Sequence, residues 1–142
     1  MWVDLASRFP WLGSEPYFVG SDDSEALLEG LPELGFQVVR AAFPGSWESA
    51  EEVLLVELTD KLGFSALGAG SRAAFSDRLW DLQRSAGEPP VAVVISGLDG
   101  LSRVDLRGFV RCVHNLLSMT EGVGLADRAN DRQIEYFFVG SW

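Results

Sequence analysis

The sequence is poor in the residues on which most enzyme and metal chemistry depends. Its 142 residues include one cysteine, one histidine and one lysine, Lys61. A single cysteine excludes an intramolecular disulfide, and one cysteine with one histidine excludes the usual zinc ligand sets. No glycine-rich loop followed by lysine is present to cradle phosphates. We therefore expect no catalytic residues, no metal and no cofactor, and a protein that is not an enzyme.

Long apolar runs are also missing. None comes near the ~20 residues that a membrane-spanning helix needs. The opening MWVDLASRFPWLG lacks the basic start and continuous apolar segment of a signal peptide. We expect a cytoplasmic protein without a membrane partner.

Positive charge is scarce as well, and its distribution is uneven. The net charge is −10; residues 1–60 hold 12 acids and 2 bases, whereas residues 61–142 hold 9 of each. Nucleic acid attracts proteins mainly through neutralised phosphates, so direct nucleic-acid binding is not expected. An acidic surface suits a basic protein partner, whose encounter it would steer. The alternative is that the acidity only aids solubility.

What the chain does contain is the pattern of a small α/β domain. Hydrophobic residues make up 47% and charged residues 23%, which is typical of one soluble globular unit. Strands alternate with helices, which predicts a small parallel sheet of three to four strands covered by helices. The expected strands are 16–20, 36–43, 91–96 and 134–140; the expected helices are 21–34, 46–63, 71–86 and 103–119, with loops at 97–102 and 122–133.

Local signals add detail to this pattern. Ser49, with Glu52 three residues later, has the spacing of a helix capping box. Cys112 lies in an apolar helical pattern and is expected to be a buried, inert thiol, and His114 a structural or surface residue. The aromatic N-terminal arm, with Trp2, Phe9 and Trp11, must pack on the rest of the protein.

The predicted helix 71–86 carries two distinct faces. At 100° per residue one side gathers a core-facing set and the opposite side a polar set that includes a tryptophan. An exposed tryptophan beside two carboxylates has the composition of an interface hot spot; the alternative is that Trp80 packs under the N-terminal arm. The core set is Ser71, Phe75, Leu79, Leu82 and Ala86, and the outward set is Ala73, Asp77, Trp80, Asp81 and Arg84.

The segment LGFSALGAGSRAAFSDRLWDL, residues 62–82, resembles the binding segment of the barstar family of ribonuclease inhibitors. Of the two inhibitory aspartates of the family, the first is replaced by Ala73 and the second is kept as Asp77. The three arginines of residues 64–84 outnumber the two aspartates, which argues against simple phosphate mimicry by this segment. The matching positions are Leu62, Phe64, Ala74, Phe75, Asp77, Leu79, Asp81 and Leu82.

The resemblance implies a barstar-like domain over residues 36–142, with residues 1–35 as an N-terminal extension packed on the core. It implies an inhibitor or immunity protein that neutralises a toxin or nuclease by occluding its active site. The alternatives are a non-inhibitory adaptor or regulatory subunit that reuses the fold, and a small hydrolase or transferase. The implied partner-binding residues are Leu67, Gly68, Ser71, Ala73, Asp77, Trp80, Asp81 and Glu121.

Overall fold

The computed structural model describes residues 2–45, 47–85, 87–124 and 131–142, with the side chains of 122–124 left out. Helices and strands alternate along most of the chain, as expected. The elements are α1 (Leu5–Arg8), β1 (Tyr17–Gly20), the 3-10 turn η1 (Ser21–Asp23), α2 (Ser24–Glu33), β2 (Gln37–Ala42), α3 (Ala50–Lys61), α4 (Arg72–Gln83), β3 (Val91–Ser96), α5 (Leu98–Val104), α6 (Leu106–Gly124) and β4 (Ile134–Gly140).

The four strands form one parallel sheet in the order β1-β4-β3-β2. The predicted α/β class and parallel sheet are therefore confirmed. β3 is central, and five of its six residues are buried, as its uninterrupted apolar sequence indicates for a strand covered on both faces. β1 pairs only with the second half of β4, from Phe137 to Gly140.

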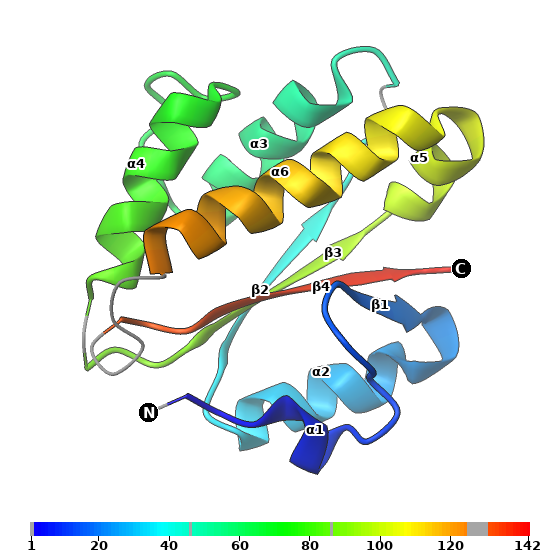
Figure 1. The fold of residues 1–142 in the computed structure, drawn as a ribbon, viewed down its shortest axis with the longest axis vertical. Coiled ribbons are helices and arrows are strands. Elements are labelled where there is room, and N and C mark those ends of the chain that lie inside the picture. The colour runs from blue at the N-terminus through cyan, green and yellow to red at the C-terminus, as the bar shows by residue number, and fades with distance from the viewer. Residues whose placement is uncertain (1, 46, 86, 125–130) are drawn as a thin grey trace.

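Helices cover both faces of the sheet (Figure 1). α3, α4, α5 and α6 lie on one face, and α1 and α2 on the other. Alternate residues of β3 point into two separate cores: Val93 and Ile95 pack with the larger helical layer, Ala92 and Val94 with the smaller one. The sequence is thus apolar on both sides of the strand because each side has its own helical cover.

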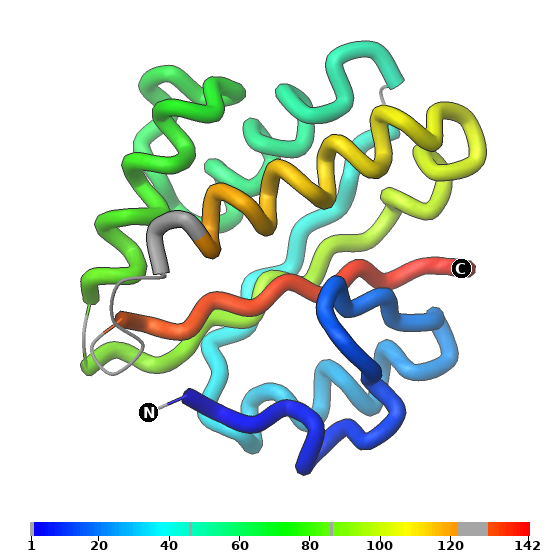
Figure 2. Tube along the Cα trace, viewed as in Figure 1, coloured from blue at the N-terminus to red at the C-terminus, as the bar shows by residue number. Residues whose placement is uncertain are grey.

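The N-terminal arm belongs to the smaller layer. Its anchors Leu5, Phe9 and Leu12 are buried in the same core as α2. A Cβ added to Gly30 would lie 2.5 Å from the Phe9 ring, so a glycine in α2 is what admits this ring. Figure 2 shows the arm running beside the start of β4, although about 130 residues separate them in the sequence.

Several local expectations were wrong. Residues 98–104, expected mostly within a loop, form α5. Ser49 does precede α3, but with a positive φ of 54° and no side-chain cap, so the capping box is absent. The third predicted helix ends at Gln83 rather than at 86. α6 extends through Gly124 into the expected loop 122–133, of which residues 125–130 lie outside the described part.

Two further features bear on the chemistry. No helix in the described ranges is long and apolar enough to cross a membrane. Cys112 is buried as expected, and burial, followed by the nearby Glu51 carboxylate, raises the pKa of its thiol to about 11.

Candidate functional site

The loop between α3 and α4, residues 62–71, is fixed at both ends. At its start, the Phe64 amide donates to the Thr59 carbonyl at 2.9 Å, and the Phe64 ring packs edge-on against Phe75 of α4. At its end, Ser71 caps α4 by accepting a hydrogen bond from the Ala74 amide. Both anchors are apolar or capping contacts that this stretch of sequence provides locally.

The tip of the loop is an exposed apolar residue held in place by an arginine. Leu67 is 81% exposed, the largest exposure among the exposed large hydrophobic residues of the described chain. Arg78 of α4 donates to the Leu67 carbonyl at 2.7 Å and to the Ala74 carbonyl at 3.0 Å. The Leu67 side chain is therefore presented to solvent by a backbone that is tied to the helix behind it.

The loop also lies directly against α3. Gly70 has a φ of +93°, and a Cβ at this position would lie 2.8 Å from the Cγ of Glu52 and 3.4 Å from Val56. Glycine thus permits both the backbone turn and the close approach. As a result Glu52 and Val56, both exposed, adjoin the loop, a neighbourhood that the sequence did not reveal.

The outward face of α4 is the one that the helical spacing predicts. Trp80 is 43% exposed, and the other four outward residues are exposed with it. On the buried side are Phe75, Leu79 and, unexpectedly, Gln83. Ser71, which the spacing placed among the core residues, is exposed because it caps the helix from outside its first turn.

Trp80 does not need the N-terminal arm as its cover. The guanidinium carbon of Arg84 lies 3.9 Å from the centre of the Trp80 ring, a cation–π contact within the helix itself. The buried anchors of the arm lie with α2 on the opposite face of the sheet. The alternative that buried Trp80 under the arm is therefore wrong.

The arginines of this segment are engaged in internal contacts. Arg72 pairs with Glu51 of α3, Arg78 holds the loop and Arg84 covers Trp80. Asp77 and Asp81 are exposed and form no ion pair within the described part of the chain. The three arginines of residues 64–84 are therefore occupied by internal contacts, whereas the two carboxylates are accessible to a partner.

The predicted site residues fall into two places. Seven of them, Leu67, Gly68, Ser71, Ala73, Asp77, Trp80 and Asp81, are exposed on the loop or on α4. We call the loop 62–71, the outward face of α4 and the adjoining Glu52 and Val56 the loop–α4 surface. Glu121 lies elsewhere: it follows Thr120, whose carbonyl accepts a hydrogen bond from Gln83 on the buried side of α4.

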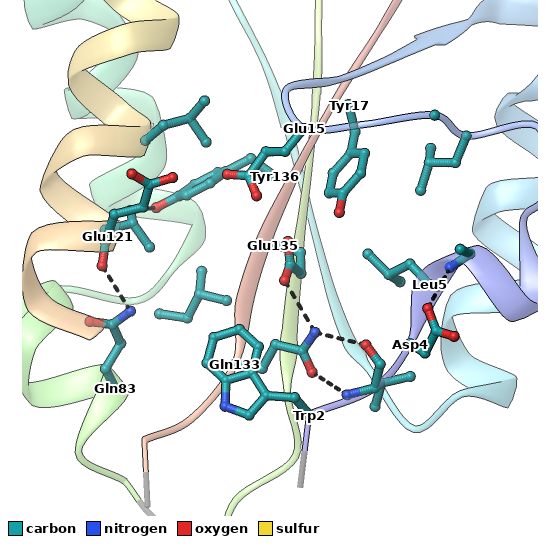
Figure 3. Close-up of a pocket in the computed structure, with 17 residues that line it drawn as sticks. Trp2, Asp4, Leu5, Glu15, Tyr17, Gln83, Glu121, Gln133, Glu135 and Tyr136 are labelled. Carbon is teal, nitrogen blue, oxygen red and sulfur yellow. Dashed lines mark hydrogen bonds between the residues drawn. The ribbon is translucent and has the colours of Figure 1, made fainter. Parts of the chain in front are cut away.

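Glu121 lines a cleft of about 750 Å³ between α6, the start of β4 and the N-terminal arm. Figure 3 shows the carboxyl groups of Glu15, Glu121 and Glu135 around the cleft, whereas the Asp4 carboxyl at its edge turns to the Ala6 amide of α1. The described lining includes no lysine, arginine or histidine. The carboxylates are Asp4, Glu15, Glu121 and Glu135. Such a lining favours a cationic group, and sequence reasoning found only Glu121 of this set.

A side-chain amide closes one wall of the cleft. Gln133 accepts from the Val3 amide at 2.8 Å and donates to the Val3 carbonyl at 3.2 Å, in the way a neighbouring strand would. Deeper in, Tyr136 shares a 2.8 Å hydrogen bond with Thr120. Complete burial raises the pKa of Tyr136, so its hydroxyl stays protonated. The wall is thus polar and neutral below a rim of carboxylates, and the buried side-chain oxygen of Gln83 has no hydrogen-bond partner in the described structure.

No group of three or more His, Cys, Asp or Glu residues is arranged to hold a metal ion in the described part of the chain. Comparison of the sequence with protein-family models, with curated proteins and with solved structures found no match. The resemblance to the barstar family consequently remains a prediction from the residues of one segment.

Proposed function

We propose that this protein binds a basic partner protein through the loop–α4 surface, and that it acts as an inhibitor or immunity protein that occludes the active site of a toxin or nuclease. The observation that carries the proposal is the presentation of Leu67: an apolar side chain 81% exposed on a loop whose carbonyl is tied to Arg78. Val56 beside the loop and Trp80 on α4 are exposed on the same surface, and exposed apolar side chains that gather in this way mark interaction sites.

Preorganisation is the physical advantage of this arrangement. A loop that is already fixed loses less conformational entropy on binding, so more of the contact energy is expressed as affinity. Trp80 adds a large ring whose position is set by Arg84, beside the exposed Asp77 and Asp81. Aromatic anchors next to charged groups dominate the energetics of many interfaces.

The charge of the surface supports a basic partner. Asp77 and Asp81 belong to α4, and α3 contributes Glu52 beside Gly70. The whole chain has a net charge of −10, which would accelerate encounter with a positively charged surface. In this proposal Asp77 accepts hydrogen bonds from basic groups of the partner, while Leu67 and Trp80 fill apolar pockets.

Two observations favour the adaptor alternative. Ala73 occupies the position of the first inhibitory aspartate of the family that the segment resembles, and Arg84 places a positive charge over Trp80. A surface with fewer free carboxylates is suited to holding a partner without mimicking its substrate. Inhibitor and adaptor differ in their effect on the partner: only an inhibitor brings its activity to zero at one equivalent.

The experiment is affinity capture of a basic protein with wild type and with Asp77→Arg/Trp80→Ala, followed by titration of the captured protein's activity. Glu29→Arg is the matched control, because Glu29 is exposed on α2 across the sheet. We expect capture by wild type and control, loss with the double variant, and stoichiometric inhibition. Equal capture by a correctly folded double variant would overturn the assignment of this surface.

A further inference from the structure

The outward side of α6 carries a stripe that is unrelated to the loop–α4 surface. Its residues recur at intervals of three and four and therefore share one side of the helix. Four of the five are exposed and the fifth is partly buried. In chain order they are Arg107, Val110, His114, Leu117 and Glu121.

An apolar groove of about 450 Å³ runs beside the stripe, between α6 and the start of β1. Its lining includes Pro16 and Val113, with Phe18 40% exposed and Val110 53% exposed. β1 is an outer strand of the sheet, so no further strand covers this side of the described structure. Leu106, 63% exposed, extends the apolar surface at the start of α6.

From its first residue to its last, the stripe is basic, apolar, histidine, apolar and acidic. If two such stripes lie antiparallel, the basic end of each therefore faces the acidic end of the other, and the apolar residues face each other. We propose that a second copy of this chain docks here, its α6 antiparallel to the first, about a two-fold axis that passes beside His114. The axis places Arg107 opposite Glu121 of the other copy and Val110 opposite its Leu117. Each contact then occurs twice, as two-fold symmetry requires.

Charge complementarity is what selects a second copy as the occupant. Arg107 and Glu121 are 14 positions apart, or about 21 Å along a helix, so they do not neutralise each other within one molecule. Neither forms an ion pair with any residue in the described ranges. The antiparallel arrangement gives both a partner and covers the apolar middle of the stripe at the same time.

The other outer strand shows how this chain protects an edge from association. β2 carries the exposed Arg40 in its centre, a charge that discourages pairing of edges. β1, with the sequence YFVG, carries no charge and leaves Phe18 partly exposed next to the groove. The side that bears the α6 stripe is thus the less protected side of the sheet.

The test is sedimentation of wild type, Arg107→Glu, Glu121→Arg and the double reversal over a range of concentrations. For wild type we expect the mass to rise from 15.5 kDa toward twice that value. Each single reversal sets like charges against each other twice and should weaken association by about tenfold or more. The double reversal restores the pairs and should recover most of the loss, a result that a general disturbance of α6 would not give.

Glu29→Arg serves as the control for net charge and should leave association unchanged, since Glu29 is on the opposite layer. Far-UV circular dichroism of each variant shows that it is folded. A wild type that stays at 15.5 kDa at every concentration overturns the proposal. So does a double reversal that associates no better than the single ones.

Discussion

Arg78 donates a 2.7 Å hydrogen bond to the carbonyl of Leu67, eleven residues before it, and so fixes the exposed tip of the loop to the helix that follows. The same guanidinium reaches the Ala74 carbonyl in the first turn of α4. One side chain thereby joins the loop and the helix into a single surface. The rigidity of that surface depends on an interaction that can be removed without touching the core.

Removing this arginine should loosen the loop. A hydrogen bond from a charged donor is worth about 1.5–3 kcal/mol, and part of that is recovered as the freed carbonyl becomes hydrated. In Arg78→Ala we expect faster amide hydrogen exchange at residues 66–71 and about tenfold weaker partner binding, with the core amides of β3 unchanged. Arg111→Ala, which removes an exposed arginine of α6, is the control. Unaltered exchange in the loop would show that Arg78 does not hold it.

Alanine substitutions at two glycines should separate the cost of backbone strain from the cost of a steric clash. Gly70 and Gly87 have nearly the same φ, +93° and +91°, but only Gly70 has Glu52 and Val56 where a Cβ would be. Gly87→Ala should lower the free energy of unfolding by the conformational cost alone, about 1 kcal/mol. Gly70→Ala should cost more, because the loop must also move away from α3. The measurement is urea unfolding of both variants.

The double variant Gly70→Ala/Glu52→Ala identifies the cause of the difference. Shortening Glu52 removes the atom nearest the added methyl group, so part of the loss should be recovered. If Gly70→Ala and Gly87→Ala prove equally stable, the close approach of the loop to α3 has no energetic consequence.

Sequence periodicity located the strands and the outward face of α4 because both are local properties. Val91–Ser96 is apolar throughout, and the spacing from Ala73 to Arg84 is that of one helix face. The contact of Gly70 with Glu52 could not be found in this way, because it depends on how α3 and α4 pack. Three of the four carboxylates of the cleft were missed for the same reason, since the N-terminal arm, α6 and β4, which are far apart in the sequence, supply them.

Gln133 offers a test of how the N-terminal arm is held. Its amide both accepts from and donates to the backbone of Val3, so Gln133→Ala removes two hydrogen bonds between segments 130 residues apart. We expect faster proteolysis near residues 2–8 and a loss of roughly 1–3 kcal/mol in stability. Gln133→Glu should resemble it, because a carboxylate cannot donate to the Val3 carbonyl and would be adjacent to Glu135. Cleavage at the wild-type rate in both variants would show that the buried Leu5 and Phe9 suffice.

The buried thiol of Cys112 should make stability depend on pH in the alkaline range. Burial raises its pKa from 9.0 to about 11, so the folded state keeps the proton that the unfolded chain begins to release near pH 9. The unfolded state is then favoured progressively, and stability falls as the pH rises from about 9 to 11.

Cys112→Ala should lack this contribution. Tyr17 and Tyr136 also have raised pKa values, which keep some alkaline sensitivity in both proteins, so the difference between the two unfolding curves isolates the thiol. The variant is expected to be less stable at pH 7, because it leaves a small cavity, and to lose less stability between pH 9 and 11. Parallel curves across that range would mean that the Cys112 thiol ionises as readily in the folded protein as in the unfolded chain.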